Sequence, residues 1–171
     1  PGMPNAADML RSEIRSTGPI PFAAYMEEAL YGGSGYYATQ TPPIGRQGDY
    51  VTGSSLSWLF GRATSRLLGR LDKKLGGADF VEIGYGSADH LRAVLQSRRD
   101  VEGRRVMAWD RVSRPLPEGV ERLAGLEDLK NSPIQGMLFS YELFDALPIH
   151  RLIGRADGSA CRSEYVQTRS G

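Results

Sequence analysis

The sequence predicts an α/β fold built on a parallel sheet, and three observations carry this prediction. A short apolar run over residues 79–83 ends in a glycine turn, Gly84 to Gly86, and an amphipathic segment follows at once. A second apolar run ends at Asp110, and a third ends at Ser140. Strand, tight turn, helix and strand is the order of a Rossmann-like unit, which places a ligand crevice at the carboxyl ends of its strands.

Helices are predicted before the sheet. Residues 8–15 form a short first helix, and apolar residues at helical spacing predict a second over 22–31, which Gly32-Gly33 ends. Residues 35–53 are rich in glycine and proline, and a loop of this length predicts a mobile lid. Ser54 or Ser55 caps a third helix that ends at Gly76-Gly77. We expect its buried face to hold Leu56, Leu59, Phe60, Ala63, Leu67, Leu71 and Leu75.

The sheet and a hairpin occupy the rest of the chain. Strands are predicted over 79–83, 105–110, 120–123 and 136–140, with a helix over 88–96. Residues 149–155 and 160–167, joined through Asp157-Gly158, predict a β-hairpin. We therefore expect three segments: helices and lid over 1–78, a Rossmann-like core over 79–148, and the hairpin over 149–171.

The composition argues against nucleic-acid-binding, disulfide-stabilised and membrane-spanning classes of protein. The 171 residues suit one domain, and a formal net charge of +1 provides no global field for nucleic acid or an anionic membrane. One cysteine excludes an internal disulfide and fits a reducing compartment. No apolar run reaches the roughly 18 residues of a membrane helix, and Pro1 to Pro4 do not start a signal peptide. These observations predict a cytoplasmic protein without nucleic-acid or membrane partners.

The glycine turn and Asp110 are the first candidate site. Gly84 and Gly86 let the backbone turn sharply and let a ligand approach closely. An acid at the end of the next strand accepts hydrogen bonds from ribose hydroxyls in both nicotinamide and S-adenosylmethionine (SAM) sites. Two alternatives remain: a glycine turn that binds nothing, and a solvated acid at a strand end. A third glycine, which the dinucleotide fingerprint requires, is replaced by Ala88 or Asp89.

Glu142 and Asp145 form the second candidate site, just past the strand that ends at Ser140. Acids at this edge bind a substrate cation or take up a proton, and the alternative is a helix start that favours acids. His90 is expected to be exposed on its helix, and Cys161 is given no catalytic role. Two histidines 60 residues apart and one cysteine do not predict a metal site.

Several segments in collinear order resemble one family, the MidA-like (DUF185) class I SAM-dependent methyltransferases. The mitochondrial branch of this family is a protein-arginine methyltransferase involved in the assembly of respiratory complex I. The resemblance implies a class I methyltransferase sheet, incomplete at its C-terminal side, with an N-terminal helical extension. The matching segments are Gly18 to Tyr31, Gly35 to Tyr37, Gly48 to Thr52, Phe60-Gly61, Glu82 to Gly86 and Ser140 to His150.

The resemblance also implies a role for each candidate residue. SAM lies over Gly84 and Gly86, with Asp110 on the ribose. The catalytic candidates Glu142 and Asp145 border the methyl donor and its acceptor. The other implied cofactor contacts are Glu82 at the amino acid moiety, Asp49 and Thr52 closing the pocket, Leu126 beside the adenine and Ser140 near the methyl.

The chain departs from the family in ways that leave its function open. Ala88 replaces the third glycine, Tyr141 replaces an Asn, and Tyr85 and Tyr141 are expected to add bulk beside the pocket. Family members are also much longer. The first hypothesis is methyl transfer from SAM to a nitrogen of a protein arginine side chain. The alternatives are a non-catalytic relative that binds or assembles other proteins, and a site for another cofactor such as NAD. A protein substrate or assembly partner is expected in the first two cases, and a homodimer stays open.

Overall fold

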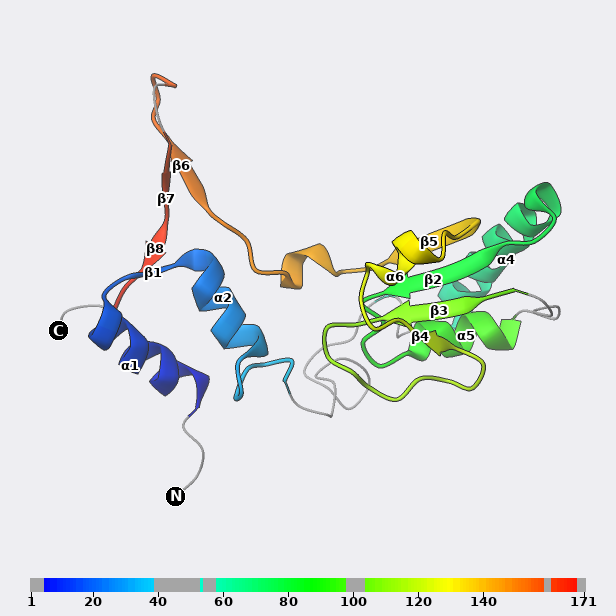
Figure 1. Ribbon diagram of the computed structural model, residues 1–171, viewed down its shortest axis with the longest axis horizontal. Helices are drawn as coiled ribbons and strands as arrows, with labels where there is room; N and C mark the ends of the chain where they lie inside the picture. Colours follow the sequence, from blue (N-terminus) through cyan, green and yellow to red (C-terminus); the bar gives the residue numbers. More distant parts are fainter. Residues whose placement is uncertain (1–4, 39–52, 54–57, 98–103, 159–160, 169–171) are drawn as a thin grey trace. The chain divides into compact units, whose positions relative to one another are not determined.

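The computed structural model describes residues 5–38, 53, 58–97, 104–158 and 161–168. The chain separates into two compact units. The first contains Pro1–Thr41 and Phe144–Gly171, and the second contains Pro42–Leu143. Figure 1 labels the helices and strands of both units, which are described separately below.

The second unit is built on a parallel sheet of four strands in the order β4-β3-β2-β5 (Figure 1). Strand β2 (Asp79–Ile83) pairs with β3 (Val106–Trp109) on one side and with β5 (Gly136–Ser140) on the other. Strand β4 (Glu121–Arg122) pairs with β3. Every strand predicted for this sheet is present, and the glycine turn follows its central strand as expected.

Helices α4 (Trp58–Leu75) and α5 (Asp89–Ser97) pack on one face of this sheet. Side chains alternate across a strand, so Phe80 and Glu82 point to this face while Val81 and Ile83 point to the other. The first face buries a core around Leu68, Phe80 and Leu91. The second face packs Val81 and Met107 under the short helix α6 (Asp128–Asn131) and its neighbours.

The buried face of α4 differs from the prediction. Leu59 is 59% exposed and Leu67 is 52% exposed, although both were expected in the core. The buried positions are instead the small residues Gly61, Thr64 and Ser65, together with Leu68. Small side chains let α4 approach α5 closely: a Cβ on Gly61 would lie 2.4 Å from the Cβ of Ala93. Close packing of the two backbones, not the leucine pattern, therefore sets which face is buried.

The amino ends of three strands are tied together by Asp79. Its carboxylate accepts from Nη2 of Arg105 at 2.6 Å, and from the backbone N–H groups of Arg105 and Gln135 at 3.3 and 3.2 Å. The hydrogen bond from Arg105 is the main reason why the pKa of Asp79 lies below its usual value. These bonds join β2 to the chain just before β3 and β5.

The first unit joins the start of the chain to its end. Helices α1 (Ala6–Thr17) and α2 (Phe22–Tyr31) pack around Leu10, Ile14 and Ile20. Strand β1 (Ile20–Pro21) pairs antiparallel with β8 (Tyr165–Val166), a pairing that the sequence did not predict. The expected hairpin is present as β6 (Leu152–Gly154) and β7 (Cys161–Ser163).

The boundaries of the two compact units differ from those of the three segments expected from the sequence. The β1–β8 pairing groups the N-terminal helices with the hairpin, and the packing of α4 on α5 groups α4 with the sheet. The functional boundaries at 78/79 and 148/149 stay a prediction.

Candidate functional site

The carboxyl edge of the sheet brings three predicted segments together. Ile83, the last residue of β2, lies opposite Trp109 on β3 and Ser140 on β5. The residues that follow these positions are the glycine turn, Asp110 and Tyr141. Because the strands are parallel and in register, the three segments leave the sheet at the same edge.

The glycine turn contains three positions with left-handed backbone. Gly84 has φ 76°, Gly86 has φ 52°, and Ala88 has φ 61°. Glycine adopts this conformation without a steric penalty, whereas alanine is disfavoured there by about 1 kcal/mol or more. Ala88 is thus a strained residue at the third left-handed position of the turn. Its methyl group is fully buried in the core on the helical face, which offsets part of the strain.

Asp110 fastens the glycine turn to the end of β3. Its Oδ2 accepts from the N–H of Gly86 at 2.8 Å, and its Oδ1 accepts from the N–H of Val112 at 2.9 Å. The guanidinium of Arg114 lies 4.0 Å from Oδ1. Each carboxylate oxygen has a second lone pair, so Asp110 still has acceptor capacity for a ligand hydroxyl.

Glu82 is buried under the helices rather than open at the edge. Its Oε2 lies 2.9 Å from Nδ1 of His90, and its side chain is 6% exposed. Burial raises the pKa of Glu82, and the nearby Asp110 carboxylate adds to the effect, while the contact with His90 opposes it. The expectation of an exposed His90 is wrong, because this residue is 3% exposed and lies among Phe60, Phe80 and Phe139.

Tyr85 does not add bulk beside the edge as expected, because its side chain belongs to the core on the helical face. Its hydroxyl donates to the carbonyl of Arg114 at 2.8 Å and accepts from the N–H of the same residue at 2.9 Å. Nη1 of Arg122 also donates to this hydroxyl, at 2.6 Å. Tyr85 therefore connects the glycine turn to the segment between β3 and β4.

The last residue of β5 and the chain after it provide polar groups at the same edge. Ser140 is half-buried, Tyr141 packs its ring on Phe60, and Glu142 is exposed with φ 50°. A side chain with a left-handed backbone is uncommon outside glycine, and such strain is frequent at functional sites. Leu126 is 41% exposed in the turn after β4, beside Asp128, whose Oδ2 accepts from Ala124 at 2.8 Å.

Three other predicted site residues lie outside the described part of the second unit. Asp145 belongs to the first compact unit, where its side chain is exposed in a short 3-10 helix, Phe144–Ala146. Asp49 and Thr52 lie outside the described residues, as does most of the predicted lid. Their proposed contacts with a ligand stay predictions.

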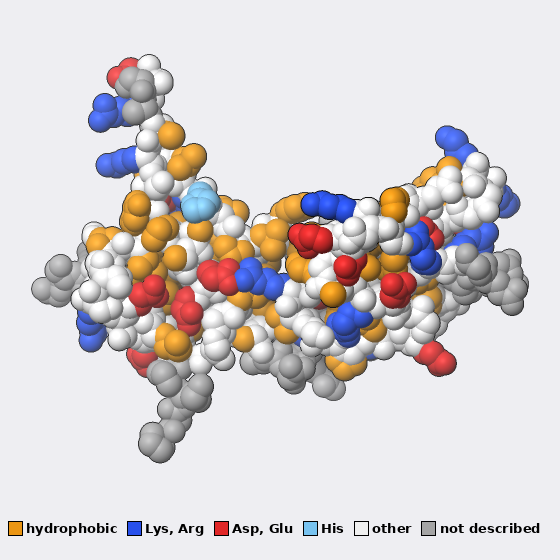
Figure 2. All heavy atoms as spheres, in the orientation of Figure 1, with side chains coloured by type: hydrophobic (Ala, Val, Ile, Leu, Met, Phe, Trp, Pro, Cys, Tyr) orange, Lys and Arg blue, Asp and Glu red, His pale blue; other side chains and the backbone are white. Residues whose placement is uncertain are grey.

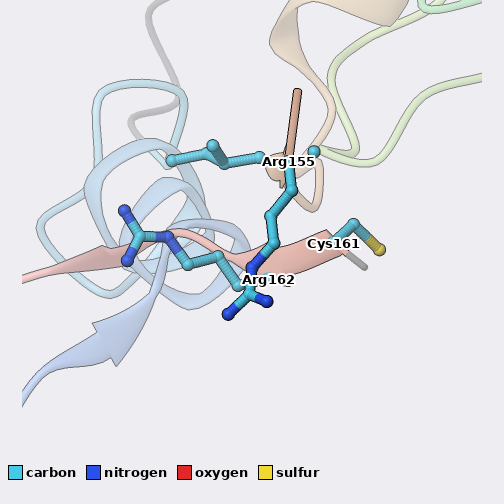
Figure 3. A pocket seen from close by; sticks show the side chains of 5 residues that line it. Arg155, Cys161 and Arg162 are labelled. Carbon is cyan, nitrogen blue, oxygen red and sulfur yellow. The ribbon is translucent and has the colours of Figure 1, made fainter. Parts of the chain in front are cut away.

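The hairpin of the first unit carries a separate hollow of about 270 Å³. Figure 3 shows Arg155, Cys161 and Arg162 around it. Figure 2 shows apolar side chains along this hairpin, where Leu152 is 61% and Ile153 is 42% exposed. Cys161 is exposed and forms no disulfide. Within the described part of the chain, no group of His, Cys, Asp and Glu is arranged to hold a metal ion, and no helix is suited to crossing a membrane.

The chain is a distant homologue of arginine methyltransferases. It is 27% identical over 185 residues to the mitochondrial protein arginine methyltransferase NDUFAF7 homolog of Drosophila melanogaster, which covers 88% of this chain. It is 29% identical over 187 residues to the mitochondrial protein arginine methyltransferase NDUFAF7 of Mus musculus, covering 83% of this chain. The matches span 42% and 41% of those relatives, so this chain corresponds to less than half of their length. No protein-family profile matches the chain.

Solved structures support the same fold. A COG1565 superfamily protein from Burkholderia thailandensis, bound to S-adenosyl-homocysteine, matches 97% of this chain with a TM-score of 0.70 and 23% identity. A second COG1565 superfamily structure from the same organism matches 95% with a TM-score of 0.63 and 22% identity. The chain covers 50% and 48% of these proteins. The fold is therefore the methyltransferase-like α/β fold, represented by about half of the length of its structural relatives.

The residues at the carboxyl edge fit a SAM-type cofactor. Gly86 presents a backbone without a side chain, and Asp110 next to it has acceptor capacity for the two ribose hydroxyls.

Proposed function

We propose that the chain binds SAM at the carboxyl edge of its sheet and catalyses methyl transfer to a nitrogen of a protein arginine side chain. The observation that carries this proposal is the hydrogen bond between Gly86 and Asp110, which sets a glycine turn against a strand-end acid. The homology to arginine methyltransferases and the S-adenosyl-homocysteine bound to a COG1565 relative support it.

The chemistry requires positioning more than bond activation. When bound, SAM supplies an electrophilic methyl group on a positively charged sulfur. The protein aligns the acceptor nitrogen with that methyl, and alignment alone supplies much of the rate enhancement. Glu142 binds the guanidinium in this proposal, orients its lone pair and accepts the proton that the methylated nitrogen gives up. The partner is then a protein substrate, and both a homodimer and a cytoplasmic location stay predictions.

A second function, binding or assembly without catalysis, is favoured by a specific observation. Ala88 places a methyl group at a left-handed position of the turn, and both Glu142 and Asp145 are exposed to solvent. A protein of this kind keeps the cofactor edge as a binding surface and transfers no methyl group.

Calorimetric titration tests the proposed cofactor. We expect wild-type protein to bind S-adenosyl-homocysteine, and we expect thermal stabilisation that increases with ligand concentration. Gly86→Val is expected to abolish binding, because a β-branched side chain is disfavoured at φ 52° and stands where the ligand approaches. Gly154→Val on the hairpin is the matched control, because nothing lies within 4 Å of a Cβ there. A wild-type protein without any binding would contradict the proposal.

Methylation of arginine-containing peptides with labelled SAM then separates the two functions. Binding together with methyl transfer supports the enzyme, and binding without transfer supports the non-catalytic alternative.

A further inference from the structure

A buried chain of polar side chains runs behind the candidate cofactor edge. Thr64 on α4, His90 on α5 and Glu82 on β2 are each less than 9% exposed. Nε2 of His90 lies 3.0 Å from Oγ1 of Thr64, and Nδ1 lies 2.9 Å from Oε2 of Glu82. Polar groups are costly to bury unless each finds a hydrogen-bond partner. The contacts between these three side chains therefore hold α4, α5 and β2 in a fixed arrangement.

The hydroxyl of Thr64 has one proton and two acceptors within reach. Oγ1 lies 3.1 Å from the carbonyl oxygen of Phe60 and 3.0 Å from Nε2 of His90, so the proton is donated to only one of them. In the arrangement that the proposal below adopts, the carbonyl receives the hydroxyl proton, Oγ1 accepts from His90, and Nε2 carries a proton.

One proton remains to be placed between Nδ1 of His90 and Oε2 of Glu82. An imidazolium facing a carboxylate and a neutral imidazole facing a protonated carboxyl both contain this proton, and both have zero net charge. Without it, a lone pair on Nδ1 would face a carboxylate oxygen in a buried site. The raised pKa of Glu82 agrees with a proton held at this contact.

We propose that His90 and Thr64 are positioning residues for the cofactor edge: Thr64 fixes the tautomer of His90, and His90 holds the Glu82 carboxyl in place through a shared proton. Glu82 lies two residues before Gly84, where the glycine turn begins, and its pairing holds the end of β2 against α4 and α5. This inference rests on the proposed function, because its readout is the affinity for the cofactor product.

Two substitutions at Thr64 isolate the role of the hydroxyl. Thr64→Ser keeps the acceptor and removes a buried methyl, whereas Thr64→Val keeps the shape and leaves Nε2–H without an acceptor. Both are expected to lower stability. Affinity for S-adenosyl-homocysteine, measured by calorimetry, is expected to stay within about twofold for Thr64→Ser and to weaken about three- to tenfold for Thr64→Val, as for one lost hydrogen bond.

His90→Phe keeps the aromatic packing against Phe139, whose ring centroid lies 4.5 Å away, and removes both nitrogens. We expect the same weakening as for Thr64→Val. If His90→Phe does not fold, the pair of Thr64 variants still decides the matter.

Nitrogen NMR of the full chain gives an independent readout. The chain has two histidines, and the exposed His150 is the internal reference. We expect a directly bonded, slowly exchanging proton on Nε2 of His90, and we expect this signal to be lost or shifted in Thr64→Val.

Equal affinity in Thr64→Val and Thr64→Ser would overturn the inference while the cofactor site stands. An unprotonated Nε2 on His90 in the wild type would do the same. A wild type that does not bind S-adenosyl-homocysteine would overturn both the proposed function and the inference.

Discussion

The backbone N–H of Gly86 donates to Oδ2 of Asp110 over 2.8 Å, so the turn after β2 is fastened to the end of β3. Oδ1 of the same carboxylate accepts from Val112 at 2.9 Å. Asp110 thus combines a structural and a proposed ligand-binding role: it shapes the turn and offers its remaining lone pairs to a ribose.

Replacing Asp110 tests the structural role first. Asp110→Ala leaves the N–H groups of Gly86 and Val112 without their acceptor, and we expect a loss of about 1–3 kcal/mol in the free energy of unfolding. Asp110→Asn keeps one acceptor oxygen and is expected to lose less. Urea denaturation measures both variants. Wild-type stability in Asp110→Ala would show that water replaces the carboxylate at no cost.

The glycines of α4 provide a matched pair. Gly61→Ala places a Cβ 2.4 Å from the Cβ of Ala93, and overpacking of this kind destabilises by about 1–3 kcal/mol. Gly69→Ala has nothing within 4 Å of its Cβ and is expected to stabilise by about 0.5–1 kcal/mol through helix propensity. Thermal or urea unfolding compares the two. A stabilising Gly61→Ala would refute the close packing of α4 on α5.

The same helix shows where sequence reasoning stopped short. The pattern of leucines predicted a helix correctly, but it placed Leu59 and Leu67 in the core, where the structure exposes them. An analysis of helical periodicity counts large apolar residues and ignores Gly61, Thr64 and Ser65. The small size of these three residues allows close contact between α4 and α5. A run of small residues at helical spacing is the signal that identifies this face.

Local sequence patterns predicted the strands of the sheet well, but they did not predict contacts between residues far apart in the sequence. The strand 79–83 and its glycine turn were located to the residue, because a short apolar run ended by glycine is a local pattern. The pairing of Ile20 with Val166 has no local signature. His90 was missed for a similar reason, because a histidine on a helix looks solvent-exposed until Glu82 and Thr64 are known to face it.

Asp79 is expected to make stability depend on acid pH. Its pKa is lowered in the folded protein, chiefly by Arg105, so the ionised form stabilises the fold above the usual pKa of 3.8. This contribution is lost as the pH falls through the lowered folded-state pKa. Asp79→Asn is expected to reduce stability at neutral pH. It is also expected to make the free energy of unfolding less dependent on pH below about pH 4. Unfolding free energies from pH 2 to 7 provide the measurement.

Asp8→Asn is the control for the acid series. Asp8 pairs with Arg11 at 3.2 Å, but both side chains are 57% exposed, and exposed pairs contribute about 0–1 kcal/mol. If Asp79→Asn and Asp8→Asn gave the same dependence of unfolding free energy on pH, the hydrogen bonds around Asp79 would not be a specific cause of the loss of stability in acid.

Glu142 allows strain and chemistry to be separated at one position. Its φ of 50° is left-handed and its side chain is exposed, so Glu142→Gly relieves backbone strain and removes little packing. The relief exceeds the extra entropy that glycine gives the unfolded chain, and we expect a gain of about 0.5–1 kcal/mol. Glu142→Gln keeps the strain and the shape and is expected to leave stability unchanged, because it removes only an exposed charge.

Activity should follow charge rather than stability. If the protein methylates arginine, both Glu142 variants are expected to lower turnover about tenfold or more while affinity for S-adenosyl-homocysteine stays within about twofold, because the carboxylate acts on the acceptor. Peptide methylation and calorimetry measure the two quantities. Full turnover in Glu142→Gln would reject the guanidinium-binding role and leave Glu142 with a conformational one. A more stable Glu142→Gly with reduced turnover would instead show strain retained at a working site, since an uncommon backbone conformation persists where function requires the side chain it carries.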